Sequence, residues 1–283
     1  MIKKIIQISS LAVLVLAILG CESRMVNAPV DVPTVRLSID VSGFSPKLLA
    51  KINQYQVSVV DKSVPETLTV TPLALDSTGH VVGLIDSLPA EISLEFTAEA
   101  LDSLGKVVFR GTTNTILDPE TVNNVLIDLS PVLPLLKSTP RYSTVIGSDT
   151  LTTHKIDIKI FSVDSLYGIS FRVRYNPNYL IMGNATLDTS LNAASVIFFQ
   201  FDSSDGLGPY KAIAVTNTVP NSSIVDANGD AVLANIRFAL VRPFTAPDST
   251  FITLEPTGLT KQDQTIIPTS VLYVDETVVK IVP

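Results

Sequence analysis

Apolar and polar residues alternate along most of the chain, with the period of two expected of half-buried β-strands. The segment GISFRVRY at 168–175 shows this clearly, because Ile169, Phe171 and Val173 lie on one side and polar residues separate them. Such runs are short and are bounded by turns rich in Pro, Gly, Asn and Asp, whereas helical periodicity is hard to find. The pattern predicts an all-β protein.

Seven strand-like segments precede residue 131, the number expected of an immunoglobulin-like β-sandwich. They are 34–41, 55–60, 66–72, 80–85, 92–101, 106–113 and 124–130. An Asp-Ser-x-Gly turn occurs twice, at 76–79 and 102–105, each time before a β-branched run. We expect Gly79 and Gly105 to supply positive φ in two hairpins.

Residues 131–140 (PVLPLLKSTP) contain three prolines, which is typical of a short, stiff linker. Nine further segments follow it, enough for a jelly-roll-like sandwich of two sheets. They are 143–147, 153–163, 168–175, 179–182, 195–202, 211–217, 231–241, 249–256 and 277–282. The sequence therefore predicts two β-sandwich domains, an immunoglobulin-like one at 34–130 and a nine-stranded jelly roll at 141–283.

The first 21 residues differ from the rest. MIKKIIQISSLAVLVLAILGC opens with Lys3 and Lys4, continues through an apolar stretch at 11–19 and ends at Cys21, the only cysteine of the chain. A basic start, a short apolar core and a small residue at the end are typical of a secretion signal. The apolar core is shorter than the ~20 residues of a membrane-spanning helix. A single cysteine also excludes an internal disulfide.

The end of this run, Ile-Leu-Gly-Cys at 18–21, resembles the lipobox of bacterial lipoprotein signal peptides. The resemblance implies that residues 1–20 are removed and that Cys21 is acylated, which anchors the chain in a membrane. The alternative is a plain signal peptide with a chance cysteine. Glu22 rather than Asp follows, so the common inner-membrane retention signal is absent, and we expect an outer-membrane or surface location in a bacterium. Residues 21–33 are interpreted as a polar, proline-bearing tether.

The overall charge narrows the choice of partners. The net charge is −7, and removing Lys3 and Lys4 leaves 18 basic against 27 acidic residues, a net of −9. Phosphate binding needs a basic field, so nucleic acid is excluded as the main partner. Against this acidic background, the two arginines of the strand at 168–175 need an explanation.

Candidate catalytic and metal-binding residues are few. His80 and His154 are the only histidines and lie in different predicted domains, so no Cys/His metal cluster can be assembled, and no Gly-x-Ser-x-Gly elbow occurs. The DANGD run at 226–230 alternates like a calcium loop, but its glycine comes fourth and its twelfth residue is Arg237, so a β-turn is the better interpretation. Paired carboxylates for glycoside hydrolysis stay open, because their spacing is three-dimensional. We expect no catalysis, no metal and no cofactor.

Two motifs of the C-terminal half resemble the cohesin family. GISFRVRYNPNYLIM (168–182) is similar to its Gly-led strand, Tyr-Asp/Asn-Pro turn and leucine-bearing strand, and DANGDAVLANIRFALV (226–241) to its Asp/Gly turn and following strand. The order and spacing of these pieces agree over about residues 141–283. The resemblance implies a nine-stranded flattened jelly roll that binds a dockerin domain of another protein through one sheet face.

The predicted partner-binding face consists of Ser170, Arg172, Arg174, Asn235 and Arg237. We expect the strands at 168–175 and 231–241 to be neighbours, with Leu233 and Ala239 also directed outward. Three arginines would then form a cationic face suited to an acidic or hydroxyl-rich helix of a partner. The alternative is that they keep a solvent-facing sheet soluble and guard it from edge pairing.

The sequence thus predicts a lipid-anchored, extracytoplasmic protein-binding module without catalysis, with the N-terminal sandwich as a spacer. Its partner would be a dockerin-like domain or another surface protein. One alternative is a carbohydrate-binding surface module, which needs an exposed aromatic strip; Trp is absent, but Phe198 and Phe199 are adjacent and one must point away from the core. The other is a structural envelope or adhesion lipoprotein without dockerin binding.

Overall fold

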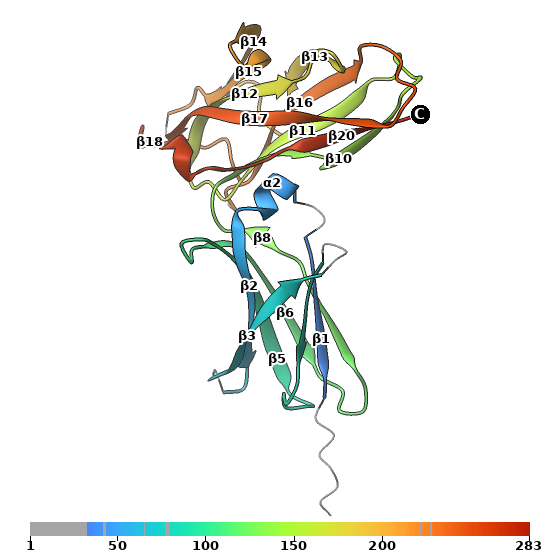
Figure 1. Cartoon of the computed structure of the whole chain (residues 1–283). Helices are drawn as coiled ribbons and strands as arrows, with labels where there is room; N and C mark the ends of the chain where they lie inside the picture. Colours follow the sequence, from blue (N-terminus) through green and yellow to red (C-terminus); the bar gives the residue numbers. More distant parts are fainter. Residues whose placement is uncertain (1–32, 42–43, 65, 77–79, 221, 227) are drawn as a thin grey trace, which may run out of the picture. The chain divides into compact units, whose positions relative to one another are not determined.

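Backbone pairing organises the chain into mostly antiparallel sheets with few helical residues, as the alternating pattern predicts (Figure 1). The computed structural model describes residues 33–283 except 42–43, 65, 77–79, 221 and 227. The expected signal peptide, Cys21 and nearly all of the expected tether lie outside the described residues. Among the helices of the described part, none has the length and apolar character needed to cross a membrane.

The strands of the first sandwich form one hydrogen-bonded sheet that bends into two layers, in the order β7-β1-β4-β3-β2-β5-β6-β8. Its strands are β1 (Val35–Asp40), β2 (Ile52–Asp61), β3 (Glu66–Leu75), β4 (His80–Ile85), β5 (Ser93–Asp102), β6 (Val107–Ile116), β7 (Asn123–Ile127) and β8 (Ser130–Pro131). Strand β3 joins the two layers, because it pairs with β2 over most of its length and with β4 at Ala74 and Leu75. Each of the seven expected segments contains a strand.

Alternation builds the core of this sandwich. Val57 and Val59 on β2 and Phe96 and Ala98 on β5 are completely buried, and half-exposed residues separate them. The expected turn glycine Gly105 has φ +74°, the left-handed region in which a side chain would be strained.

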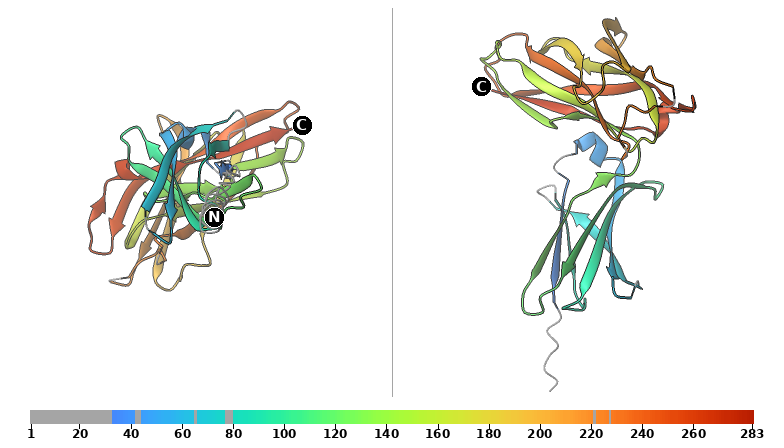
Figure 2. Two further views of the ribbon diagram at one scale, coloured as in Figure 1. Left: turned by 90° about the horizontal axis from the view of Figure 1, so that it is seen from below. Right: turned by 180° about the vertical axis from the view of Figure 1, so that it is seen from behind.

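Two further sheets form the second sandwich, and views from the front and from behind show them as separate layers (Figures 1 and 2). The seven-stranded sheet has the order β10 (Tyr142–Ile146), β20 (Thr277–Val282), β17 (Asp248–Lys261), β12 (Leu166–Tyr175), β15 (Gly208–Asn217), β14 (Val196–Asp205), with β18 (Ile266–Ile267) also on β17. The five-stranded sheet has the order β13 (Leu180–Leu187), β16 (Ala231–Leu240), β11 (His154–Phe161), β9 (Leu135–Thr139), β19 (Tyr273–Asp275). Among the described strands, three pairs, β1–β7, β10–β20 and β9–β19, are parallel. All nine expected strands are present.

The expected linker at 131–140 is wrong as a description of this segment. It contains β9, which pairs with β11 and β19 inside the five-stranded sheet. The LLKST run begins with two consecutive buried leucines, and the prolines at 134 and 140 flank the strand rather than interrupt it. Leu136 points into the core of the second sandwich and Leu135 into the core of the first, so β9 belongs to both.

A buried carboxylate connects the two sandwiches within the unit Pro33–Pro283. Asp275 at the end of β19 is completely buried, and its Oδ1 accepts hydrogen bonds from the N–H groups of Ser45 (2.9 Å) and Glu276 (3.1 Å). The ammonium of Lys137 on β9 lies 3.3 Å from its Oδ2. Ser45 is the N-cap of the short helix α2 (Pro46–Leu49), so Asp275 orients the start of that helix.

Further contacts extend this junction. Tyr273 on β19 donates a hydrogen bond to Oδ2 of Asp102 at 2.9 Å, and burial and this carboxylate raise the pKa of Tyr273 to about 12. Tyr273 and Phe161 also pack against the core of the first sandwich. Apolar burial and an ion pair together therefore hold the junction.

Replacing Asp275 with Ala should destabilise the protein strongly, because it removes the carboxylate that accepts hydrogen bonds from two backbone N–H groups and pairs with Lys137. We expect the free energy of unfolding of residues 33–283 to fall by about 3–5 kcal/mol in denaturant titrations. The double variant Lys137→Met/Asp275→Leu, which removes both charges, should recover part of this loss. A loss below about 1 kcal/mol for Asp275→Ala would show that the pair contributes little.

Candidate partner-binding face

The structure divides the five predicted face residues between two sheets. Ser170, Arg172 and Arg174 lie on β12 in the seven-stranded sheet, whereas Asn235 and Arg237 lie on β16 in the five-stranded sheet. The expectation that these strands are neighbours is wrong, because β12 pairs with β15 and β17 and β16 pairs with β11 and β13. Alternation in sequence reveals which side of a strand faces the core, but both layers of a sandwich share that core.

Strand β16 also departs from regular alternation. Arg237 is exposed and Asn235 is half-buried, as expected for an outward direction, but Leu233 is completely buried together with Ala234. The pairing of β16 with β11 shifts at a bulge between Ile158 and Lys159, which turns two consecutive residues inward. The amide of Asn235 donates to Oδ2 of Asp188 at 2.8 Å, so it is engaged on its own sheet.

The two arginines of β12 are held in an ion network, in which Arg174 is largely buried and Arg172 is partly exposed. Arg174 binds Asp205 with both terminal nitrogens (2.9 and 2.6 Å) and pairs through Nε with Glu255. Arg172 reaches the same Asp205 at 3.1 Å. Both guanidinium groups lie over the ring of Tyr210, at 4.6 and 5.0 Å from its centroid. Two carboxylates therefore balance two arginines, and this part of the face is not cationic.

This network shifts the pKa values of its members. Hydrogen bonds from Arg174 and from the N–H of Leu207 lower the pKa of Asp205 to about 2. The same carboxylate, with Glu255, raises the pKa of Arg174 above its usual value. Asp205 begins the turn between β14 and β15, and Arg174 also donates to the carbonyl of Gly208 at 3.4 Å. The arginines thus hold the turn of the β14–β15 hairpin against β12.

Beside this network lies an apolar depression, which we call the aromatic groove. It has a volume of about 220 Å³ and is lined chiefly by Ser170, Arg172, Phe199, Phe201, Ala212, Ala214 and Thr257. Two rungs of the sheet create it: Ser170, Ala214 and Phe199 are register partners in one, and Arg172, Ala212 and Phe201 in the next. The alanines form a low floor on β15, and the exposed rings of β14 form one wall.

Sequence reasoning found the groove only in part. The adjacent Phe198 and Phe199 indicate that one ring points away from the core, and Phe199 is that ring, 59% exposed. Phe201 is 49% exposed and continues the same side of β14. The floor of the groove, formed by Ala212 and Ala214, could not be predicted from the sequence. Alanine at alternate positions of a strand is compatible both with a buried face and with an exposed one.

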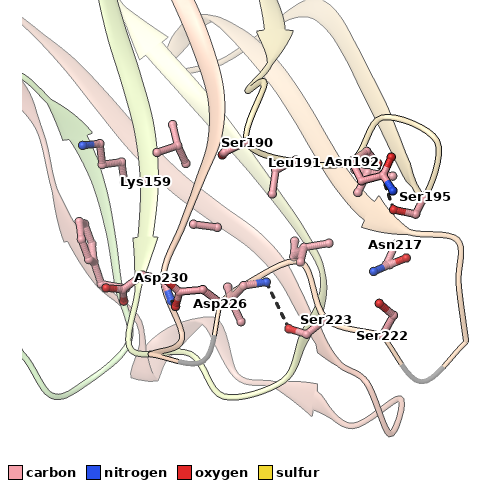
Figure 3. Close-up of a pocket in the computed structure, with 16 residues that line it drawn as sticks. Lys159, Ser190, Leu191, Asn192, Ser195, Asn217, Ser222, Ser223, Asp226 and Asp230 are labelled. Atoms are coloured by element: carbon pink, nitrogen blue, oxygen red, sulfur yellow. Dashed lines mark hydrogen bonds between the residues drawn. The ribbon is translucent and has the colours of Figure 1, made fainter.

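A larger cavity of about 670 Å³ lies between the ends of β11, β14, β15 and β16 (Figure 3). Its polar groups serve the loops that carry them: Ser195 donates to the carbonyl of Asn192, and Ser223 accepts from the N–H of Val225. At its edge, Oδ1 of Asp226 accepts from the N–H groups of Asn228 and Asp230, at 2.8 and 3.0 Å. The N–H of Gly229 also donates to the carbonyl of Asp226 at 3.0 Å, which agrees with the turn expected here. Within the described part of the chain, no group of three or more His, Cys, Asp or Glu side chains is placed to hold a metal ion.

Comparisons with known proteins give cohesin domains as structural neighbours. No protein-family model and no curated protein matches this chain. A non-cellulosomal cohesin from the archaeon Archaeoglobus fulgidus is 15% identical, with a TM-score of 0.38, over 53% of this chain and 92% of that one. The third cohesin ScaC of Acetivibrio cellulolyticus, in complex with the ScaB dockerin, is 15% identical over 53% and 100% of the chains, with a TM-score of 0.42. The Coh-OlpA domain of Clostridium thermocellum, in complex with Doc918, is 10% identical over 53% and 99%, also with a TM-score of 0.42.

The lowered pKa of Asp205 predicts a pH-dependent contribution to stability. A carboxylate whose pKa is lower in the folded than in the unfolded state stabilises above pH 3.8, and this contribution disappears as the pH falls through about 2. We expect Asp205→Asn to be less stable than wild type at neutral pH and the difference to shrink between these two values. Thermal unfolding at a series of pH values measures this.

The exposed Asp128, outside the network, provides a matched control as Asp128→Asn. A difference between wild type and Asp205→Asn that stays constant from neutral pH to pH 2 would argue against the network.

Proposed function

We propose that this chain is a lipid-anchored, extracytoplasmic protein-binding module without catalysis. It docks a partner protein through the outer face of β17, β12, β15 and β14. The N-terminal sandwich, immunoglobulin-like in our reading of the sequence, acts as a spacer between the anchor and this face. The observation that carries the proposal is the aromatic groove with its rigid border.

The size of the groove favours a protein partner over a small molecule. Ligand pockets usually enclose about 300–1,000 Å³, whereas the groove has about 220 Å³, enough for one or two side chains. Exposed aromatic rings are enriched at protein interfaces, where a partner covers them. Ser170 and Thr257 share a hydrogen bond of 2.9 Å at the opposite side, which gives the groove a polar border.

The balanced charges change the kind of partner surface expected. Because Asp205 and Glu255 neutralise Arg172 and Arg174, the face gives no reason to require an acidic partner. Apolar burial in the groove would supply most of the affinity, and salt would weaken binding only slightly. Arg237 and Asn235, on the other sheet, have no part in this face.

The partner class rests on the sequence motifs at 168–182 and 226–241, which resemble those of cohesins. On that basis we propose a dockerin-like domain, with another surface protein as the remaining protein partner. A carbohydrate ligand is less well supported, because the rings of Phe199 and Phe201 are tilted by 58° and form no planar strip.

Filling the groove should weaken docking. We expect Ala214→Arg to weaken binding at least about 30-fold, the loss of a central contact worth 2 kcal/mol or more. Titration calorimetry of residues 33–283 with dockerin domains encoded by the source genome measures this. Ala239→Arg on the outer side of β16 is the matched control, since Ala239 lies on the other sheet beside the exposed Ile181.

Three outcomes would count against this function. Equal binding by Ala214→Arg and wild type would remove the groove as the docking site. Binding of polysaccharide in place of any dockerin would favour the carbohydrate alternative. No binding of either would favour a structural envelope lipoprotein.

Membrane anchoring has its own test. We expect cells expressing the full chain to incorporate labelled fatty acid into it, and Cys21→Ala to prevent both labelling and removal of residues 1–20. Gel mobility and fluorography of membrane fractions measure these together. Labelling that persists in Cys21→Ala would contradict acylation at this residue.

A further inference from the structure

Strand β14 leaves one edge of the seven-stranded sheet open. Among the described strands it pairs only with β15 and ends the sheet order, and Figure 1 shows it there. It is ten residues long and keeps one register with β15 from Val196 to Asp205, without a bulge. An open edge of this length offers a row of free backbone donors and acceptors to another strand.

The other edge strands of the described part are protected in ways that β14 is not. Strands β7, β8, β10 and β19 have two to five residues each. Strand β13 is longer but contains a register shift between Met182 and Ala185. The segment 196–205 (VIFFQFDSSD) contains no Lys, Arg or Pro, the residues that commonly block edge pairing.

Both charges of β14 are already paired within the chain. Asp205 binds Arg172 and Arg174, and Asp202 lies 2.6 Å from the buried ammonium of Lys211. The outward side carries Ile197, Phe199 and Phe201, which are 54%, 59% and 49% exposed. The edge therefore combines open backbone groups with an apolar stripe.

The backbone pattern identifies which groups are free. The N–H of Thr218 donates to the carbonyl of Ser195, and Asp205 and Gly208 close a two-residue hairpin turn. Hydrogen-bonded pairs alternate along two antiparallel strands. At both ends of β14 the hydrogen-bonded pair contains an odd-numbered residue, Ser195 at one end and Asp205 at the other, so the odd-numbered residues of β14 bond to β15. Phe198, Gln200 and Asp202 consequently direct their backbone groups toward the open edge.

We propose that two copies of this chain associate by pairing β14 with β14, antiparallel, about a two-fold axis at Phe199. Phe199 of one copy then faces Phe199 of the other in a non-hydrogen-bonded pair, the type with the closer side chains. Phe198 of each copy exchanges backbone hydrogen bonds with Gln200 of the other. The proposal goes beyond the docking function and does not rest on it.

This register is self-complementary, which is why we propose a second copy of the chain as the partner of the β14 edge. Ile197 of one copy faces Phe201 of the other, so the apolar stripe continues across the axis. Asp202 faces Val196, and no like charges stand opposite each other, an arrangement that cross-strand pairing favours. A two-fold axis makes the same strand serve on both sides. The pairing would also bring the two aromatic grooves onto one continuous sheet.

The test is the mass of residues 33–283 in sedimentation across a dilution series. The unit Pro33–Pro283 contains both cores, so this segment is suited to the experiment. We expect the mass to double on concentration. Phe199→Lys and Phe199→Glu should each remain single, because the axis places like charges together, and their equimolar mixture should regain the doubled mass.

Ile181→Lys is the matched control: Ile181 is 58% exposed on the edge strand β13, and its replacement should leave association unchanged. Melting curves verify that each variant is folded. Three results would each overturn the proposal. Wild type could stay monomeric at every concentration, Phe199→Lys by itself could show the doubled mass, or the mixture could stay monomeric while wild type dimerises. Ala214→Arg, which fills the groove, should still associate, so failure of docking and failure of pairing are distinguishable.

Discussion

The surface of the second sandwich depends on the ion network in which Arg174 is held by Asp205 and Glu255. Arg174, a residue that is only 9% exposed, needs such partners, since an unpaired buried charge would be costly. The network joins β12, β17 and the β14–β15 turn in one place. It thereby adds side-chain contacts between the turn of the β14–β15 hairpin and the sheet, beside the backbone pairing of β15 with β12.

Most of the proposed docking surface lies on that hairpin. Its first strand supplies the rings of the aromatic groove and the open edge, and its second strand supplies the alanine floor. The arginines of the alternating strand at 168–175 are therefore not the recognising groups that an acidic chain first indicates. Both are paired with Asp205, Arg174 also with Glu255, and Arg172 at the same time lines the groove.

The sequence was a good guide to strands and a poor guide to their assembly. Alternation located every long strand, since burial of one side imposes it locally. The assignment of β12 and β16 to one sheet failed because pairing between distant strands leaves no local trace. Leu233 was misplaced by a bulge, and β9 was hidden by flanking prolines, which bound a strand as readily as they stiffen a linker. Phe199 was partly visible, because adjacent residues of a regular strand point to opposite faces and only one face of β14 meets the core of the sandwich.

Phe199 belongs both to the aromatic groove and to the open edge strand β14. Exposing alternate apolar residues on a regular edge strand carries an aggregation hazard, and chains usually avoid it with charge, proline or a bulge. Here the neighbouring carboxylates are engaged elsewhere, so nothing on the strand opposes association. A ring in this position is best explained if something covers it. In the two proposals, a partner protein binds the outer face of β14 at the groove, and a second copy of the chain pairs with the backbone at the edge of β14. Because these are different sides of one strand, both contacts can exist at once.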